Sequence, residues 1–355
     1  MDAAADLPLP CRELTALAEA VGRVAGVDEA RRRAADIVAF VAGQLGSGLG
    51  GFHLARLIAA LNDRLVCRVI ALTARRHRLP QVPWCWLALG SEGRCEQTFV
   101  TDQDNGLIFS AADATEAEAL RRLFLPFAHE VNGALAECGF ALCRGEVMAG
   151  NPKWCLSLDE WEMQFIEWVR RPEPMALMHA TIFFDLRPLY GDVSLGERLR
   201  DLLLRLTGDT PAFLHLMAAN ALQSQPPLGL LGEVVSEDGE RGGVDLKKYG
   251  ARIFVDAARI FALASGVRPV ETRLRLQEAG RKCGLLDHEV AAAQAALSHL
   301  LRLRLAAQAT ALAAGEVPDH GVRPGSLHDV DRAILKESLR QAKRVQQRLK
   351  LNYAL

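Results

Sequence analysis

The residues from 84 to 109 constrain the fold of this chain more than any other part of its sequence. A short apolar run, WCWLAL, stops at Gly90 and Ser91, and a polar segment follows it. A second apolar run, LIF, begins soon after Asp102 and Asp104. Short apolar runs bounded by glycine and polar residues predict buried β-strands. We therefore expect two strands joined by a polar connection, with both aspartates at the start of the second strand.

Helical periodicity surrounds this region on both sides. In residues 12–78 apolar residues recur every three to four positions, and the pattern from residue 195 onward is almost wholly helical. The polar, glycine-rich stretch at 236–243 predicts an exposed loop within that second half. Trp84 and Trp154 lie in apolar surroundings that favour a place in the core over a base-stacking role.

Further strands are predicted at residues 139–147 and 181–192, which are rich in apolar and aromatic residues. The sequence therefore predicts an α+β fold, in which a small α/β unit is flanked by an N-terminal helical segment and a C-terminal helical bundle. The predicted boundaries of these three parts are 1–78, 79–192 and 193–355.

Composition narrows the classes of function. The chain has 42 basic and 43 acidic residues and a net charge of −1, which provides no general attraction to a polyanion and argues against general nucleic-acid binding. Its apolar runs are shorter than the roughly 20 residues that cross a membrane. Its eight cysteines form no CxxC pair, and its first residues lack the pattern of a signal peptide. We therefore expect a cytoplasmic protein that does not bind membranes.

The two aspartates have the spacing of a cation site. Residues two apart on a strand point to the same face, with Cα atoms about 6.5–7 Å apart. Asp102 and Asp104 would repel each other there unless a cation lay between them. Oxygen ligands of this kind suit Mg²⁺, with Mn²⁺ as an alternative. A lone pair of aspartates is more often the start of a turn, so the prediction depends on the neighbouring residues.

Those neighbours are suited to phosphate groups. Gly90 and Gly93 allow the backbone to approach a ligand without a Cβ atom in the way. Ser91 offers a hydroxyl and a main-chain N–H group, and Arg94 offers a planar guanidinium that can grip a phosphate. A strand, a Gly-Ser turn and an aspartate pair together outline a site for a magnesium-bound triphosphate.

These motifs resemble a known family. Gly90-Ser91, Gly93-Arg94 and Glu96-Gln97, followed by Thr101–Asn105, are similar to nucleotidyltransferases of the polymerase-β type. The motifs also resemble those of the bacterial enzymes that uridylylate the nitrogen-regulatory PII protein or adenylylate glutamine synthetase. More specifically, the chain resembles a group of signal-transduction nucleotidyltransferases that often carry cyclic-nucleotide-binding and CBS domains. Phrases at 148–154, 182–192 and 245–250 also resemble that group.

Two departures from the relatives are expected. The part of the chain ahead of this unit is too short for cyclic-nucleotide-binding and CBS modules. The chain also lacks the pattern of an HD-type hydrolase, because Asp287-His288 has the reverse order. Removal of a transferred nucleotide by the same chain is therefore not implied.

The resemblance assigns roles to individual residues. Asp102 and Asp104 would bind the metal ions, Ser91 and Arg94 would hold the β- and γ-phosphates, and Gly90 and Gly93 would let the backbone approach. The family's third carboxylate, a metal ligand or base, would be Asp185, with Glu146 as the second candidate. The structural alternative for Asp185 is a buried salt link to Arg187. Glu96 and Gln97 would be supporting or helix-capping groups.

Three lysines are candidate nucleotide contacts, with a solvated turn lysine as the alternative for each: Lys153, Lys247 and Lys248. The resemblance implies a Mg²⁺-dependent transfer of a nucleoside monophosphate from a nucleoside triphosphate to an acceptor hydroxyl, on a regulatory protein. The alternative is a nucleotide-sensing interaction module without turnover.

Overall fold

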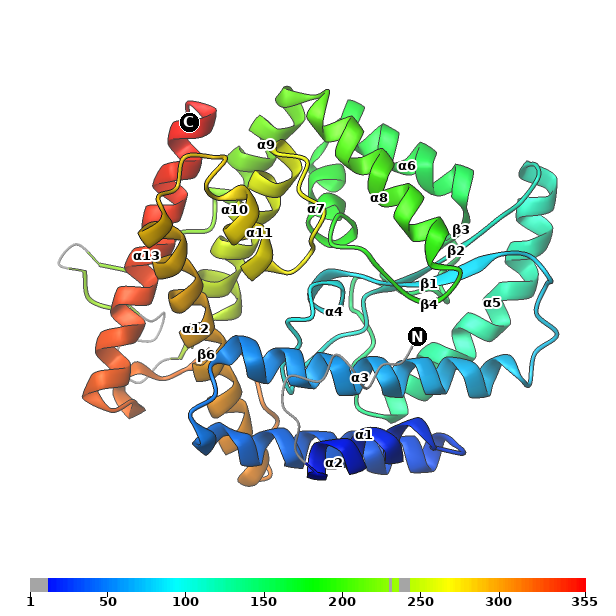
Figure 1. Cartoon of the computed structure of the whole chain (residues 1–355), viewed down its shortest axis with the longest axis horizontal. Coiled ribbons are helices and arrows are strands. Elements are labelled where there is room, and N and C mark those ends of the chain that lie inside the picture. Colours follow the sequence, from blue (N-terminus) through cyan, green and yellow to red (C-terminus); the bar gives the residue numbers. More distant parts are fainter. Residues whose placement is uncertain (1–11, 230–231, 236–242) are drawn as a thin grey trace. The chain divides into compact units, whose positions relative to one another are not determined.

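The computed structural model describes residues 12–229, 232–235 and 243–355, which form two compact units. The first unit comprises the residues up to Gln44, Ala55–Trp168 and His179–Leu203. The second comprises Leu45–Leu54, Val169–Met178 and Leu204–Leu355. The predicted α+β class is confirmed, because a small mixed sheet lies among many helices (Figure 1). The boundaries at 78/79 and 192/193 stay a prediction, since the units interleave along the chain. Most of the predicted loop at 236–243, namely 236–242, lies outside the described residues.

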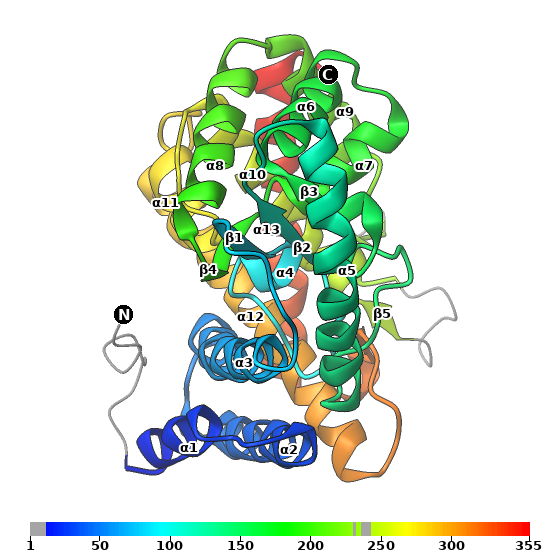
Figure 2. The same ribbon diagram turned by 90° about the vertical axis from the view of Figure 1, so that its right-hand side faces the viewer.

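The predicted N-terminal helices form. They are α1 (Arg12–Gly22), α2 (Val27–Gly43) and α3 (Gly51–Ala74), with a short 3₁₀ helix, η1 (Gln44–Ser47), between the last two. α3 runs alongside α1 and α2 in both views (Figures 1 and 2). Arg64 on α3 donates a hydrogen bond to the Ala18 carbonyl, and Arg68 donates one to the Val24 carbonyl.

The sheet of the first unit has the strand order β3-β2-β1-β4. β1 (Trp84–Ala88) lies antiparallel to both β2 (Asn105–Phe109) and β4 (Arg187–Gly191), while β3 (Cys155–Ser157) lies parallel to β2. The predicted strand pair around the polar connection is therefore confirmed. Pro188 cannot donate to a neighbouring strand, which suits the edge position of β4.

Helices cover both faces of this sheet. Trp84 and Phe109 are paired across β1 and β2, and their rings meet Phe124 of α5 (Ala114–Glu137), at centroid distances of 5.9 and 5.2 Å. On the other face, Gly106 lies under Trp161 of α6 (Leu158–Arg170). Leu87, paired with Gly106, lies against α8 (Val193–Gly208). Side chains of β1 and β2 thus point alternately to the two helical layers. Figure 2 shows these helices around the strands.

Two strand predictions are wrong. Residues 139–147 form no named strand; their ladder contact is one parallel bridge between Ala141 and Asp102, and the segment then turns. In 181–192, the first residues belong to helix α7 (Pro174–Phe183), and only β4 is a strand. Phe183, the last residue of α7, packs against a cluster of aromatic rings. The apolar residues that predicted a strand are therefore explained by burial of a helix. β3, preceded by the 3₁₀ helix η2 (Pro152–Trp154), was not predicted.

An aromatic cluster forms the core beside β3. Phe183 lies at its centre, with ring centroids 4.4 Å from Trp154, 5.6 Å from Trp161 and 5.1 Å from Trp168. Trp161 also donates a hydrogen bond from Nε1 to the Leu107 carbonyl. The predicted core role of Trp154 is confirmed.

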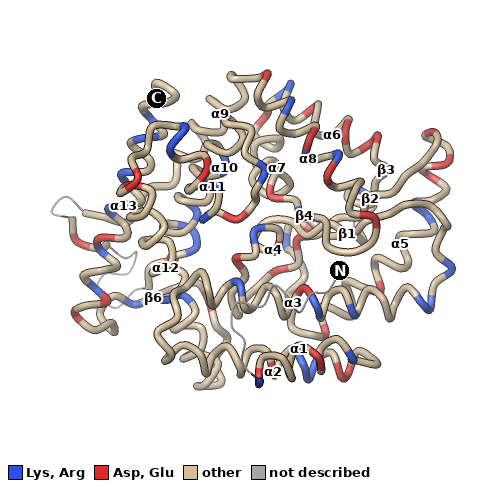
Figure 3. The backbone as a smooth tube through the Cα atoms, in the orientation of Figure 1, with Lys and Arg blue, Asp and Glu red and all other residues tan. Residues whose placement is uncertain are grey.

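The second unit is mainly helical, as predicted. Its main helices are α9 (Pro211–Ala221), α10 (Arg252–Ala264), α11 (Thr272–Ala279), α12 (Asp287–Ala313) and α13 (Asp329–Tyr353). Its shorter elements are β5 (Val244–Asp245), the π-helical turn η4 (Lys247–Ala251), β6 (Gly321–Val322) and η5 (Pro324–Ser326). Basic and acidic positions are mixed along α13 (Figure 3), where Arg332 pairs with Asp329 and Arg340 with Glu337. Within the described residues, every helix is too short or too polar to span a membrane.

Truncation of the aromatic core tests this packing. Phe183 is 1% exposed, so Phe183→Ala should lower the free energy of unfolding by about 3–5 kcal/mol through lost burial and a new cavity. Leu123, on the outer face of α5, is 54% exposed, and Leu123→Ala should change that free energy by less than about 0.5 kcal/mol. Urea denaturation measures both. Equal small effects would show that the aromatic cluster is not packed as described.

Candidate functional site

The Gly-Ser turn lies directly against the aspartate segment. After β1 the chain enters a single helical turn, α4 (Gly90–Gly93). Gly90 has φ +54°, a conformation that favours glycine. A Cβ atom at Gly90 would lie 2.9 Å from Oδ2 of Asp104. The main-chain N–H of Leu89 also donates to the Asp104 carbonyl, at 2.9 Å. The backbone conformation thus favours glycine at residue 90, and a Cβ atom there would also displace the Asp104 carboxylate.

The two aspartates share one face, and the residues between and after them share the other. Asp102 is exposed and Asp104 half-buried, whereas Gln103 and Asn105 are 2% and 1% exposed. The aspartates precede β2 rather than begin it, in an extended segment that the Ala141 bridge and the Leu89 hydrogen bond hold in place. This alternation indicates that the two carboxylates lie on the opposite side of the segment from Gln103 and Asn105.

A buried amide network holds the aspartate segment from behind. Gln103 donates to the carbonyls of Asn132 and Phe140, both at 3.0 Å. Asn132 on α5 donates to Oε1 of Gln103 at 2.8 Å and to Oδ1 of Asn105 at 3.0 Å. Asn132 and Asn105 also accept hydrogen bonds from the main chain at Gly150 and Ala149. The network therefore joins the aspartate segment, α5 and the loop that leads to Lys153.

Asn132 was not among the residues predicted from the sequence. Its signal was available, because an asparagine inside a helix is unfavourable unless its side chain has a partner. Asn132 lies on the face of α5 that also carries Leu135 and Val131, so a polar residue in that apolar stripe called for a buried partner.

Arg94 is held between two carboxylates. Its Nη1 donates to Oδ2 of Asp185 at 2.6 Å, and its Nε donates to Oε2 of Glu96 at 2.9 Å. Asp185 is 0% exposed. A Cβ atom at Gly93 would lie only 1.9 Å from the Asp185 carbonyl oxygen, so the turn and the segment before β4 are packed backbone to backbone.

The predicted salt link between Asp185 and Arg187 is wrong in its partner. Asp185 forms a buried ion pair with Arg94, whereas Arg187 pairs with Asp63 of α3, at 2.9 Å. Arg187 was the expected partner because it lies two residues from Asp185 in the sequence. Helix α7 ends at Phe183 and β4 begins at Arg187, so the side chains of Asp185 and Arg187 need not point to the same side. The other carboxylate candidate, Glu146, is exposed, with φ +55°. Its neighbour Val147 accepts a hydrogen bond from the Asn105 N–H, so Glu146 flanks the aspartate segment.

The remaining predicted residues fall in different places. Lys153 is exposed in the first unit, and its N–H donates to the Asn151 side chain. Lys247 and Lys248 are exposed in the second unit. Nζ of Lys247 lies 3.3 Å from Nε2 of His320, and Nζ of Lys248 lies 4.7 Å from the centroid of the Tyr249 ring. The first unit therefore brings together the Gly-Ser turn, Arg94 and the aspartates, and the two later lysines belong to the other unit.

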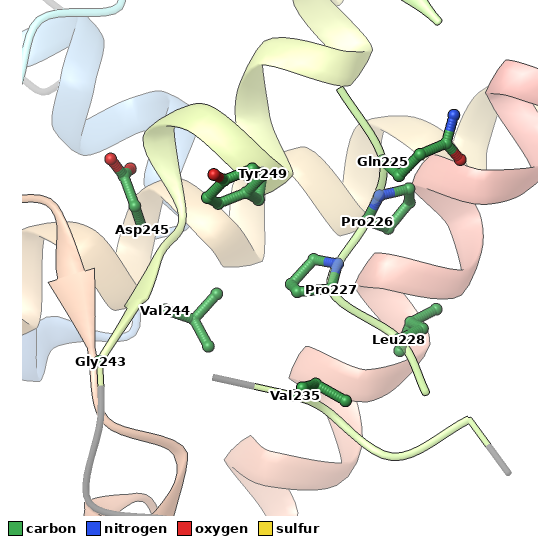
Figure 4. Close-up of a pocket in the computed structure, with 9 residues that line it drawn as sticks. All are labelled: Gln225, Pro226, Pro227, Leu228, Val235, Gly243, Val244, Asp245 and Tyr249. Atoms are coloured by element: carbon green, nitrogen blue, oxygen red, sulfur yellow. The ribbon is translucent and has the colours of Figure 1, made fainter. Parts of the chain in front are cut away.

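The second unit has a cavity of its own next to these lysines. It has a volume of about 440 Å³, within the range of small-molecule pockets. Val244 and Tyr249 line it from one side, and Pro226 and Pro227 from another (Figure 4). Its other lining residues include Gln225 and Asp245.

The first unit contains an acidic group that the sequence reasoning did not single out. Glu92, on α4, is 5% exposed, and its Oε1 atom has no hydrogen-bond partner among the described residues. Burial, with the nearby negative charge of Asp63, raises the pKa of Glu92 to about 8, although Arg187 opposes the shift. A glutamate beside Ser91 in a buried turn therefore holds its proton at neutral pH.

The donor set fits a hard cation bound together with a phosphate-bearing ligand. Among the described residues no group of three or more His, Cys, Asp or Glu side chains is arranged to hold a metal ion. Magnesium commonly uses one or two carboxylates and takes its other ligands from water and substrate phosphates. The accessible pair Asp102 and Asp104 matches that requirement.

Comparison with family models agrees with this geometry. Residues 35–175 match the model described as "Putative nucleotidyltransferase DUF294", and residues 211–353 match "Putative nucleotidyltransferase substrate binding domain". Over these two regions the chain is similar to a nucleotidyltransferase family. The first match contains the Gly-Ser turn and both aspartates, and the second contains Lys247, Lys248 and the cavity beside them. A comparison with curated proteins gives no match.

The contact between Gly93 and Asp185 leads to a prediction on stability. Gly93→Ala would place a Cβ atom against backbone oxygens of Asp185 and Ala88, so the turn must shift. We expect a loss of about 1–3 kcal/mol in the free energy of unfolding. Gly133→Ala, at an exposed position of α5 with no atom within 4 Å of the added carbon, should instead gain about 0.5–1 kcal/mol. Thermal denaturation of both variants checks the contrast, which a loss of stability in both would contradict.

The pKa of Glu92 leads to a prediction on pH dependence. An unfolded chain releases the Glu92 proton near pH 4.5 and the folded chain near pH 8, so the folded state binds more protons between these values. The free energy of unfolding should therefore fall as pH rises from about 5 to 8, with a contribution on the order of a few kcal/mol. Glu92→Gln should remove that part of the slope, and Glu137→Gln, at an exposed position, should keep it. Urea denaturation at pH 5, 6.5 and 8 measures the slopes; the same slope in Glu92→Gln and wild type would refute the assignment.

Proposed function

We propose that this protein is a Mg²⁺-dependent nucleotidyltransferase that moves a nucleoside monophosphate from a nucleoside triphosphate to an acceptor hydroxyl on a regulatory protein. The observation that carries the proposal is the accessible face shared by Asp102 and Asp104, with the Gly90 backbone packed against Asp104. The similarity of residues 35–175 and 211–353 to nucleotidyltransferase models supports the general reaction.

The residues would divide the work as follows. Carboxylate oxygens of Asp102 and Asp104 hold Mg²⁺ (or Mn²⁺), which when bound neutralises charge on the triphosphate and its leaving group. Ser91 contacts the β- and γ-phosphates across the space that Gly90 leaves open. Arg94, oriented by Asp185 and Glu96, presents its guanidinium to the same phosphates. Lys153, Lys247 and Lys248 remain candidate contacts to the nucleotide or the acceptor.

The reaction is an in-line displacement. The acceptor oxygen forms a bond to the α-phosphorus, and the bond from that phosphorus to the bridging oxygen of the β-phosphate breaks. Pyrophosphate leaves with the electron pair of that bond. The hydroxyl proton passes to a water molecule or to a carboxylate oxygen of the aspartate pair.

We assign Asp185 a positioning role within this site. It is buried, and its carboxylate is bonded to Arg94, so it acts on the phosphates through that guanidinium. Glu146, exposed beside the aspartate segment, is the alternative third carboxylate.

A second candidate function is nucleotide sensing without turnover. The observation that favours it is that, among the described residues, no group of three or more His, Cys, Asp or Glu side chains is arranged to hold a metal ion. Calorimetry combined with a pyrophosphate assay separates the two functions, because a sensor binds magnesium and nucleotide without releasing pyrophosphate.

Substitution of a metal-binding carboxylate tests the proposed transfer. Asp104→Asn keeps the size of the side chain and removes its charge, which should slow transfer about a hundred- to ten-thousand-fold, the equivalent of several kcal/mol. The assay uses each of the four α-³²P-labelled nucleoside triphosphates with MgCl₂ and an extract of the source cells as the acceptor. Asp159→Asn, at an exposed position of α6, is the matched control and should transfer label like wild type. Equal labelling by Asp104→Asn and wild type would contradict the proposal.

A further inference from the structure

Arg187 makes three hydrogen bonds that converge beneath the Gly-Ser turn. Its Nη2 donates to the Glu92 carbonyl at 3.0 Å, and its Nε donates to the Gly93 carbonyl at 3.2 Å. Nη2 also donates to Oδ1 of Asp63 at 2.9 Å. One guanidinium on the edge strand β4 therefore binds the last two carbonyls of α4 and a carboxylate on α3.

The turn needs this support. A helix of four residues is not stable by itself, since nucleation costs more than one turn returns. The carbonyls at a helix C-terminus need partners from outside the helix, and a cation is the favoured one. The Glu92 carbonyl also accepts a hydrogen bond from the Cys95 N–H, at 3.1 Å, and Arg187 adds a cationic donor to it and to the Gly93 carbonyl. A strand of the sheet therefore helps to hold the turn that faces Asp104.

Asp63 keeps Arg187 in that position. The two side chains are 21% and 24% exposed, so the guanidinium lies in a largely buried environment and requires a nearby negative charge. Glu92 lies close enough for the charge of Arg187 to oppose the rise in its pKa, but the ion pair with Arg187 belongs to Asp63.

The neighbouring residue on α3 supports the other half of the site. Nδ2 of Asn62 donates to Oε1 of Gln97 at 3.3 Å, and Nε2 of Gln97 donates to Oγ1 of Thr101 at 3.3 Å. Thr101 directly precedes Asp102. Two adjacent residues of α3 therefore reach both parts of the site, the turn through Arg187 and the aspartate segment through Gln97.

We propose that Asp63 and Arg187 are positioning residues for the nucleotide, and that α3 is the support that sets the turn and the aspartate segment at one fixed separation. This inference rests on the proposed function, because it assumes that the turn and the aspartates bind a magnesium–nucleotide complex. It assigns a supporting role in the site to α3, a helix that lies outside the sheet and its connecting turn.

Two variants weaken the contacts from Asp63 through Arg187 to the turn in different ways. Asp63→Asn keeps the shape and removes the charge. Arg187→Lys keeps the charge but replaces a planar fork with a single ammonium group, which cannot span two carbonyls and a carboxylate. We expect each to weaken magnesium–nucleotide binding about 10- to 100-fold, the usual effect of removing a residue that orients a ligand-binding group. Asp63→Glu keeps the negative charge, so its magnesium–nucleotide affinity should lie much closer to that of wild type than the affinity of Asp63→Asn does.

Arg121 provides a matched control for the structural cost. It is a partly buried arginine on α5 that donates to Glu160 and, from Nε at 2.9 Å, to the Cys155 carbonyl. Its ion pair and its backbone carbonyl partner resemble those of Arg187, but neither belongs to the turn or the aspartate segment. Arg121→Lys should therefore lower the melting temperature without changing nucleotide affinity.

Isothermal titration calorimetry with MgCl₂ and each nucleoside triphosphate, on the full chain, gives the affinities, and thermal denaturation gives the stabilities. Weaker binding in Asp63→Asn and Arg187→Lys, with recovery in Asp63→Glu and unchanged binding in Arg121→Lys, supports the inference. Binding as tight as wild type in Asp63→Asn and Arg187→Lys overturns it and leaves the proposed function standing. No binding by wild type at any nucleotide overturns the proposed function and this inference together.

Discussion

The contact between Gly90 and Asp104 is the constraint on which the arrangement of the first unit depends. A Cβ atom at residue 90 would lie within 2.9 Å of the Asp104 carboxylate, and the Leu89 N–H already bonds to the Asp104 carbonyl. The turn after β1 and the segment before β2 are therefore held together ahead of any ligand. Antiparallel pairing of β1 and β2 makes this contact possible, because the end of one strand and the start of the next lie side by side.

Polar side chains fix the site from behind. Asn132, Gln103 and Asn105 satisfy one another and the main chain of the following loop, which leaves Asp102 and Asp104 on the accessible side. Buried networks of this kind are costly when incomplete, so each amide restricts the positions of the others. Arg187 and Asp63 act in the same way beneath α4. The position of the aspartate pair is thus set by buried polar residues behind it.

The helices, the first two strands and the aspartate pair could be predicted because their signals are local. Periodicity indicated α3, α5 and the helices of the second unit, and the apolar runs with flanking glycine indicated β1 and β2. The errors came from segments whose apolar residues admit more than one structure. Phe183 ends helix α7 and is buried together with Phe184, and 139–147 approach Asp102 through one bridge without becoming a strand. Short apolar runs cannot distinguish a buried helix from a buried strand.

The sequence by itself determined which groups this protein can bring to a ligand: a Gly-Ser turn, two aspartates two residues apart, and an arginine four residues after Gly90. These features depend on residue type and on spacings of a few residues. Over such short spacings, the local backbone geometry determines the direction in which each side chain points. Only the tertiary structure decided the ion pairs of Asp185 and Arg187, the buried state of Glu92, and the part played by Asp63 and Asn132. Their partners lie tens of residues away in sequence, and which long-range pair forms depends on how α3, α5 and β4 pack against the turn.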